Sequence, residues 1–184
     1  PDVLTSATAD HTWALLMSAA RRIPESIEYV RNGKWRTWGP LLLLGREISG
    51  STLGIIGLGR IGKEVARRAG GFGMRVLAYD EYQDADFAAA NNVEYTDMDT
   101  VLREADFLTL HVALTPETRH LIGSEEFAKM KPTAILINAA RGPVVDTDAL
   151  VAALASGEIL AAALDVTDPE PLPADAPFYQ MPNV

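Results

Sequence analysis

The chain has 184 residues, of which 48% are hydrophobic and 22% charged, a composition typical of one folded domain with a substantial core. A formal net charge of −9 at pH 7 disfavours nucleic acid as a partner, because a phosphate backbone would require clustered Lys and Arg. The chain has no cysteine, which excludes disulfides and thiolate metal ligands, and no metal site is predicted. No apolar run could span a bilayer and the first residues lack a basic leader, so we expect a cytoplasmic protein.

The first 50 residues predict helices followed by an irregular apolar segment. Residues 11–35 have apolar side chains at helical spacing after a short lead of Thr, Ser and Ala. Pro24 indicates either a kink in one long helix or the start of a second helix. Residues 36–50, RTWGPLLLLGREISG, fit neither a helix nor a strand and are unusually apolar for a loop. We therefore expect another surface to cover them.

From Ser51 onward, short apolar runs alternate with helical patterns. The predicted strands are residues 52–57, 75–80, 105–112, 133–140 and 160–166, with a weak strand at 93–95. The predicted helices lie near residues 60–72, 97–104, 124–130 and 146–156. This alternation predicts an α/β fold, a doubly wound parallel sheet of the Rossmann type, with residues 1–184 forming one dinucleotide-binding domain.

A glycine-rich loop, Gly57-Leu58-Gly59-Arg60-Ile61-Gly62, lies between the first predicted strand and a helix. In this context Gly57 permits a tight turn, Gly59 lets the backbone approach a pyrophosphate, and Gly62 allows close packing of helix on strand. The start of the helix presents N–H groups to the phosphates. The loop therefore predicts a dinucleotide site.

Asp80 ends the second predicted strand, where a carboxylate can accept both hydroxyls of the adenosine ribose. This position favours NADH over NADPH, because a 2′-phosphate would meet a like charge. A simpler alternative is that the glycines only form a turn and that Asp80 only caps a strand. A second alternative is a methyltransferase that binds S-adenosylmethionine, but its loop needs no third glycine for phosphate, so the full pattern favours a diphosphate.

Ligands of doubly wound sheets bind beyond the carboxyl ends of the strands, so the residues there are candidates for the site. These candidates are His111, Val112, Ala139, Ala140, Arg141, Asp165 and Glu170. Arg141 follows two small alanines and precedes a glycine, and its guanidinium suits a substrate carboxylate. Two alternatives remain open for it, a surface position and a structural pair with Asp146.

Glu170 and the three histidines are the candidate residues for proton transfer. Glu170 stands between two prolines, where it could orient a histidine, and without such a partner it would be a solvated turn residue. His11 is expected on the first helix as a surface or interface residue, and His120 on a loop or helix cap. His111 could contact the cofactor, but no acid is expected beside it. None of the three histidines is a strong candidate for the catalytic group.

Four segments in this order, TLGIIGLGRIG, LHVALTPETRHLI, INAARGPVVD and ALDVTDPEPLP, resemble the cofactor domain of D-isomer-specific 2-hydroxyacid dehydrogenases. The segment GKWRTWGP, together with LDVTDPEPLP, is most similar to the glyoxylate/hydroxypyruvate reductase branch of that family. Ala113 stands where the family's HxPLT motif has proline. The resemblance covers nearly the whole chain and implies an NAD-dependent oxidoreductase acting on a small 2-oxo or 2-hydroxy acid.

The resemblance also implies roles for individual residues. Arg141 would bind the substrate carboxylate and carbonyl, and Glu170 would pair with a catalytic histidine. Arg60 and Ile61 would meet the pyrophosphate, Asp80 the adenosine ribose and Asp165 the nicotinamide carboxamide. The cofactor channel would be lined by Val112, Thr118, Ala139 and Ala140.

The family's histidine comes a few residues after a Pro-Asn-Val turn, so we expect it beyond Val184, with the substrate domain in flanking segments. The chain alone is then expected to bind cofactor without turnover. The resemblance implies a homodimer through residues of about 10–45 with Trp38 near the partner's active site, whereas Leu41 to Leu44 could instead enter their own core. A competing function on the same fold is a non-catalytic, NAD-sensing interaction protein similar to a corepressor.

Overall fold

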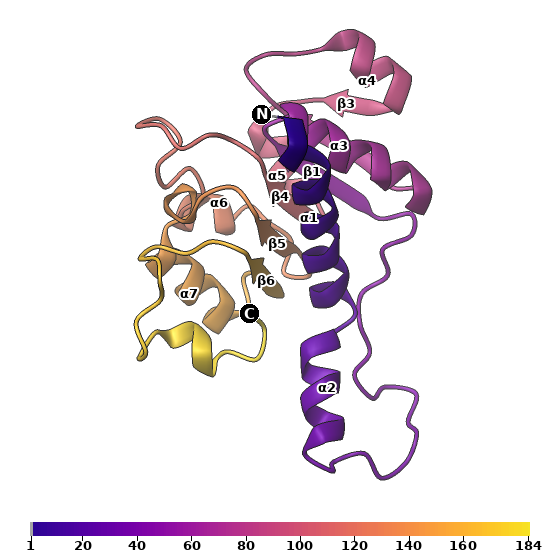
Figure 1. Cartoon of the computed structure of the whole chain (residues 1–184), viewed down its shortest axis with the longest axis vertical. Coiled ribbons are helices and arrows are strands. Elements are labelled where there is room, and N and C mark those ends of the chain that lie inside the picture. Colours follow the sequence, from indigo (N-terminus) through magenta and orange to yellow (C-terminus); the bar gives the residue numbers. More distant parts are fainter. Residues whose placement is uncertain (1) are drawn as a thin grey trace.

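The parallel sheet runs through the centre of the molecule in the order β3-β2-β1-β4-β5-β6, and helices cover both of its faces (Figure 1). The computed structural model describes residues 2–184. The strands are β1 (Thr52–Ile56), β2 (Arg75–Tyr79), β3 (Val93–Tyr95), β4 (Phe107–Leu110), β5 (Ile135–Asn138) and β6 (Ala161–Leu164). The helices are α1 (Thr5–Ala20), α2 (Ile23–Arg31), α3 (Arg60–Ala69), α4 (Ala85–Asn91), α5 (Met98–Glu104), α6 (Ser124–Phe127) and α7 (Thr147–Ser156). The predicted doubly wound α/β fold is confirmed.

The sheet divides the core into two hydrophobic clusters. Leu53 and Ile55 of β1 belong with the buried faces of α1 and α3, whereas Ile56 belongs with α5, α6 and α7 on the other side. Side chains of a strand alternate between the faces, so both faces of this central strand are buried and its sequence is almost continuously apolar. A Cβ at Gly54 would lie 2.8 Å from Ala105 Cβ, so a glycine here lets the end of α5 lie directly on the sheet.

The N-terminal region forms two helices, and Pro24 lies in the first turn of the second. Of the two predicted alternatives, the start of a second helix is therefore confirmed, and a kink in one long helix is not observed. Between them Arg22 takes a left-handed conformation, with φ of 53°. The first helix begins earlier than the helical spacing predicted from residue 11, because α1 already starts at Thr5. Helix α1 packs on α3, β5 and β6, with Trp13 buried and stacked on Phe72 at 4.9 Å between ring centroids.

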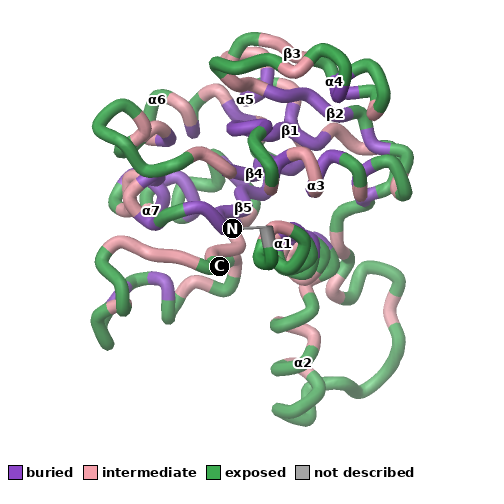
Figure 2. The backbone as a smooth tube through the Cα atoms, turned by 45° about the horizontal axis from the view of Figure 1, so that its top comes forward, coloured by how far each residue is buried: buried purple, intermediate pink, exposed green. Residues whose placement is uncertain are grey.

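Helix α2 and the segment that follows it extend away from the sheet (Figures 1 and 2). No residue of α2 is buried, and the apolar side chains of the following segment are exposed. Exposed fractions are 63% for Trp35, 77% for Trp38, 78% for Leu41 and 64% for Leu44. The alternative that Leu41 to Leu44 enter their own core is therefore wrong, and within residues 2–184 nothing covers this surface.

Two helices differ from the sequence-based prediction. Helix α4 was not predicted, and it begins where the Asp84 carboxylate accepts a hydrogen bond from the Phe87 N–H at 3.0 Å. Helix α6 is shorter than the predicted 124–130. No helix in the described part of the chain is long and apolar enough to cross a membrane.

Candidate active site at the carboxyl ends of the strands

The order in which the chain adds strands to the sheet reverses between β1 and β4, the central pair of strands. The chain leaves β1 toward β2 and returns to β4 on the other side, and such a switch point is where doubly wound sheets bind ligands. The glycine loop follows β1 and His111 follows β4, so both lie at this point. The two strands are parallel neighbours, so their carboxyl ends lie at the same edge of the sheet.

Gly57 and Gly62 form the turn from β1 into α3. Gly57 has φ of +95°, and a Cβ there would lie 2.7 Å from the carbonyl carbon of His111. A Cβ at Gly62 would lie 2.3 Å from the Gly57 carbonyl oxygen. Any side chain at either position would overlap backbone, which confirms the predicted turn and packing roles of these two glycines.

The space above the first turn of α3 fits a phosphate group. A Cβ at Gly59 would meet no atom within 4 Å, so the backbone is open to close approach. The first helical hydrogen bond of α3 runs from the Lys63 N–H to the Gly59 carbonyl oxygen at 2.9 Å, so the N–H groups before it face the end of the helix. A cavity of about 190 Å³ lies here, lined by Leu4, Thr5, Arg60, Ile61 and His111. The residues present therefore fit the diphosphate of a dinucleotide.

Asp80 lies at the end of β2 and binds the glycine loop. Its Oδ2 accepts a hydrogen bond from the Leu58 N–H at 2.6 Å, and its Oδ1 accepts one from the Tyr82 N–H at 2.8 Å. A carboxylate has about four acceptor positions, so each oxygen can still accept a ribose hydroxyl. The side chain has a structural role in this loop, and that role is compatible with the predicted one.

His111 lies at the end of β4 against Gly57. Its Nε2 is 2.9 Å from the hydroxyl of the buried Thr109, and its Nδ1 is buried with no hydrogen-bond partner in residues 2–184. Burial lowers the pKa of His111 from 6.5 to about 4, because the charged form loses its hydration. The imidazole is therefore neutral at pH 7, and it forms no ion pair with an acid within residues 2–184.

Asn138 shapes the turn that carries Arg141, and the sequence analysis missed it. Its Nδ2 donates to the Arg141 carbonyl oxygen at 3.0 Å, and its Oδ1 accepts from the Ala140 N–H at 3.0 Å. The side chain is only 1% exposed, and a buried amide at the end of a parallel strand was the available signal. Both bonds hold the turn so that the Arg141 side chain is exposed at the edge of the sheet.

Arg141 donates from Nη1 to the carbonyl oxygen of Ala140 at 2.6 Å. The predicted alternative, an ion pair between Arg141 and Asp146, does not form in the structure. Asp146 caps α7 by accepting from the Ala149 N–H at 3.0 Å, and its Oδ2 lies 3.7 Å from His120 Nδ1. The guanidinium forms no ion pair within the described residues, so it is available to an anion.

The segment that carries Glu170 lies against the Arg141 turn. A Cβ at Gly142 would lie 1.9 Å from the Thr167 carbonyl oxygen, so the two backbones are in direct contact. Thr147 also donates to the Asp168 carbonyl oxygen at 2.8 Å. Glu170 is exposed between Pro169 and Pro171, and no hydrogen bond or ion pair joins it to a histidine within residues 2–184.

The remaining predicted channel residues occupy two loops. Thr118 lies in the loop after β4, where its hydroxyl donates to the Ala113 carbonyl oxygen at 2.6 Å, and Val112 starts the same loop half-buried. Ala139 and Ala140 follow β5 and are each 8% exposed. Both alanines are therefore largely covered by the protein itself.

Asp165 follows β6 and contacts a residue that sequence analysis did not connect with it. Its Oδ1 lies 3.0 Å from Nε2 of His11 on α1. Both side chains are about half exposed. The pair joins the N-terminal helix to the carboxyl edge of the sheet, next to the strand that carries Arg141.

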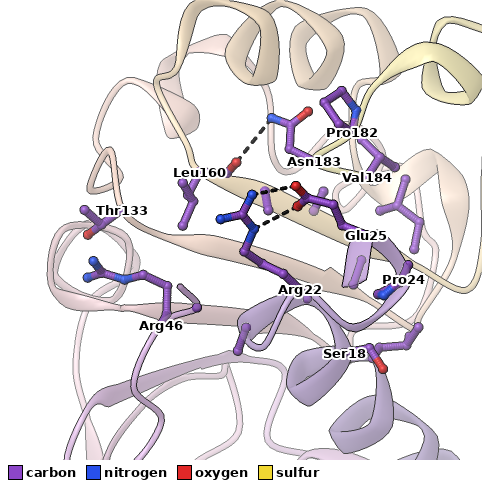
Figure 3. A pocket seen from close by; sticks show the side chains of 18 of the residues that line it. Ser18, Arg22, Pro24, Glu25, Arg46, Thr133, Leu160, Pro182, Asn183 and Val184 are labelled. Carbon is purple, nitrogen blue, oxygen red and sulfur yellow. Dashed lines mark hydrogen bonds and ion pairs between the residues drawn. The ribbon is translucent and has the colours of Figure 1, made fainter. Parts of the chain in front are cut away.

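A second and larger cavity, of about 650 Å³, is separate from these residues (Figure 3). It follows the outer edge of β6 and is bounded by α1, by the start of α2 and by residues 182–184. Arg22 and Glu25 form an ion pair at 2.6 Å on its wall, and most of the other lining side chains are apolar. Because it shares no residue with the glycine loop, it is not the dinucleotide site.

Comparison with known proteins identifies the family. The profile described as "D-isomer specific 2-hydroxyacid dehydrogenase, NAD binding domain" matches residues 13–184. The glyoxylate reductase of Korarchaeum cryptofilum is 53% identical over 185 residues, covering 100% of this chain and 56% of that protein. The glyoxylate/hydroxypyruvate reductase B of Escherichia fergusonii is 49% identical, covering 100% of this chain and 57% of that protein.

Comparison with solved structures identifies the same family. The D-isomer specific 2-hydroxyacid dehydrogenase of Lactobacillus delbrueckii ssp. bulgaricus, in its NAD-complexed form, matches with a TM-score of 0.88 and 38% identity, over 100% of this chain and 59% of that one. The chain thus spans about half the length of the relatives that it matches. Glycine loop, sheet order and profile match all lead to the same conclusion: the chain belongs to the D-isomer-specific 2-hydroxyacid dehydrogenase family, as its NAD-binding domain.

Proposed function

We propose that the protein to which this chain belongs transfers hydride between NAD(H) and a small 2-oxo or 2-hydroxy acid such as glyoxylate or hydroxypyruvate. The observation that carries this proposal is the direct contact of the Arg141 turn with the Thr167–Glu170 segment, at the same edge of the sheet as the glycine loop. In this arrangement Arg141 would supply a cation for the substrate carboxylate at the edge of the sheet that also carries the glycine loop. The names of the relatives support the substrate class.

NADH is the proposed cofactor in preference to NADPH. The Asp80 carboxylate would accept the ribose hydroxyls and would repel a 2′-phosphate. Arg60 and Ile61, at the start of α3, would meet the pyrophosphate, and His111, Val112, Thr118, Ala139 and Ala140 would line the channel. A bound nicotinamide supplies the hydride.

The chain's own side chains would bind and orient the substrate. Arg141 would hold the carboxylate in a bidentate pair and polarise the carbonyl. Glu170 would orient a histidine that donates the proton to the carbonyl oxygen. Since no hydrogen bond or ion pair joins Glu170 to any of the three described histidines, we assign that proton to a histidine outside these 184 residues.

We also infer a homodimer in which residues of about 10–45 interlock, with Trp38 close to the partner's active site. The support is the group of exposed apolar side chains on α2 and residues 35–44, because such a group typically marks a partner surface. The cavity along β6 adjoins this surface at Arg22, Pro24 and Leu44. A cytoplasmic location remains a prediction from the sequence.

The test is oxidation of NADH by the whole protein in the presence of glyoxylate or hydroxypyruvate. Turnover that depends on the 2-oxo acid, and that falls when Arg141 is replaced by Leu, is the expected result. Tight NADH binding with no turnover of any 2-oxo acid would contradict the proposal and favour the NAD-sensing interaction protein.

A further inference from the structure

We propose that His11 is a positioning residue for the nicotinamide end of the cofactor, acting through Asp165. The observation is the 3.0 Å contact between His11 Nε2 and Asp165 Oδ1, which joins residues 154 positions apart. The inference rests on the proposed function and on the role that the family resemblance implies for Asp165, which would accept a hydrogen bond from the nicotinamide carboxamide. It adds a residue of α1 to that site.

The backbone of α1 places His11 accurately. Thr12 and Leu16 are fully buried beneath the helix, and Trp13 Nε1 donates to the Val65 carbonyl oxygen on α3 at 3.2 Å. On the neighbouring face of the helix, Asp10 pairs with Arg68 at 2.8 Å. The buried contacts of Thr12, Leu16 and Trp13 fix both the position and the rotation of α1, so His11 approaches β6 from a rigid element.

Asp165 needs such support because its side chain is exposed. Its backbone N–H donates to the Asn138 carbonyl oxygen at 3.0 Å, which fixes the main chain and leaves the carboxylate free to rotate. Contact with His11 engages Oδ1, and Oδ2 has no partner in residues 2–184. A carboxylate held in this way presents its second oxygen to an amide N–H before the cofactor arrives, which reduces the ordering cost of binding.

The imidazole can provide this bond in either protonation state. Both the imidazolium and the neutral tautomer with hydrogen on Nε2 donate to Asp165. Glutamine, whose terminal amide nitrogen also donates, should replace this function in part, whereas leucine of similar size cannot. Substitution by Gln and by Leu therefore separates the hydrogen bond from the volume of the side chain.

The experiment compares NADH with ADP-ribose, which has no nicotinamide, by calorimetric titration of the 184-residue chain. His11→Leu should weaken NADH roughly two- to fivefold, as expected for a partly exposed pair, and should leave ADP-ribose affinity unchanged. His11→Gln should restore most of the NADH affinity. In an Asp165→Ala background, His11→Leu should have no further effect, because no side-chain acceptor for His11 remains at position 165.

Asp10→Asn is the matched control, since it breaks the neighbouring exposed ion pair of the same helix without touching Asp165. It should leave the ratio of NADH to ADP-ribose affinities at the parent value. An unchanged ratio in His11→Leu, or an equal loss for both ligands, would overturn the inference while the proposed function stands. A parent chain that binds neither ligand would overturn the proposed function and this inference together.

Discussion

The carboxylate of Asp80 accepts a hydrogen bond from the Leu58 N–H at 2.6 Å, which connects the end of β2 to the middle of the glycine loop. The residue proposed to recognise the ribose therefore also holds the loop proposed to bind the diphosphate. A substitution at Asp80 changes both, so cofactor preference must be read from the ratio of two affinities.

Asp80→Ala should lower NADH affinity roughly tenfold or more, because charge-assisted hydrogen bonds to two hydroxyls are lost. NADPH affinity should change less, and Asp80→Arg should narrow or reverse the preference. Titration of both cofactors by fluorescence measures the ratio. Glu81→Gln replaces an adjacent exposed acid and serves as the control, which should leave the ratio of NADH to NADPH affinities unchanged. Equal affinities for NADH and NADPH in the parent chain would contradict the assignment of Asp80.

Gly59→Ala and Gly62→Ala should separate binding from folding. At Gly59 the added methyl meets no atom, so the thermal midpoint should stay near the parent value, but NADH affinity should fall roughly tenfold because the methyl occupies the phosphate approach. At Gly62 the methyl overlaps a carbonyl oxygen, so unfolding free energy should fall by roughly 1–3 kcal/mol. Loss of stability in the Gly59 variant, with binding intact, would reverse these assignments.

His111 should make stability depend on pH. Burial lowers its folded-state pKa to about 4 against an ordinary 6.5. Between these values the unfolded chain binds more protons, so the free energy of unfolding falls as pH falls from 6.5 to 4, by roughly 2–3 kcal/mol. Urea unfolding of His111→Gln and of the parent at both ends of this range measures the difference.

The 184-residue chain alone should reduce glyoxylate and hydroxypyruvate at no appreciable rate, although it binds NADH. Removal of a general acid typically costs roughly a hundredfold to ten-thousandfold in rate, and the substrate domain is expected outside these residues. A coupled assay of NADH oxidation tests this. Turnover at an ordinary dehydrogenase rate would show that His11, His111 or His120 supplies the proton.

The chain should be a dimer at micromolar concentration. Trp38→Ala combined with Leu42→Asp should weaken the dimer roughly tenfold or more, because aromatic anchors contribute most to interfaces and a buried charge opposes association. Light scattering over a dilution series measures this. Tyr82→Ala removes another aromatic side chain, 85% exposed and outside residues 10–45, and should leave the mass unchanged. A monomeric parent, or a dimer indifferent to the double substitution, would count against this interface.

Local pattern was sufficient for the sheet and the glycine loop. The apolar runs predicted all six strands, including the weak strand at residues 93–95, because both faces of a parallel sheet are buried and its strands must be apolar. The roles of Gly57 and Gly62 also followed from spacing, since the sterics of a strand-turn-helix unit involve residues close in sequence. The ends of predicted strands likewise brought Asp80 and Arg141 to one edge.

Contacts between distant segments could not be read in this way. The pairing of His11 with Asp165 and the exposure of Leu41 and Leu44 depend on where α1 and α2 dock, which no local period encodes. The early start of α1 has the same origin, because packing of Ala9 and Thr12 against the core stabilises a helix that intrinsic propensity alone leaves marginal. Periodicity specifies which face of an element is apolar, whereas the partner of that face is selected by the free energy of packing over the whole chain.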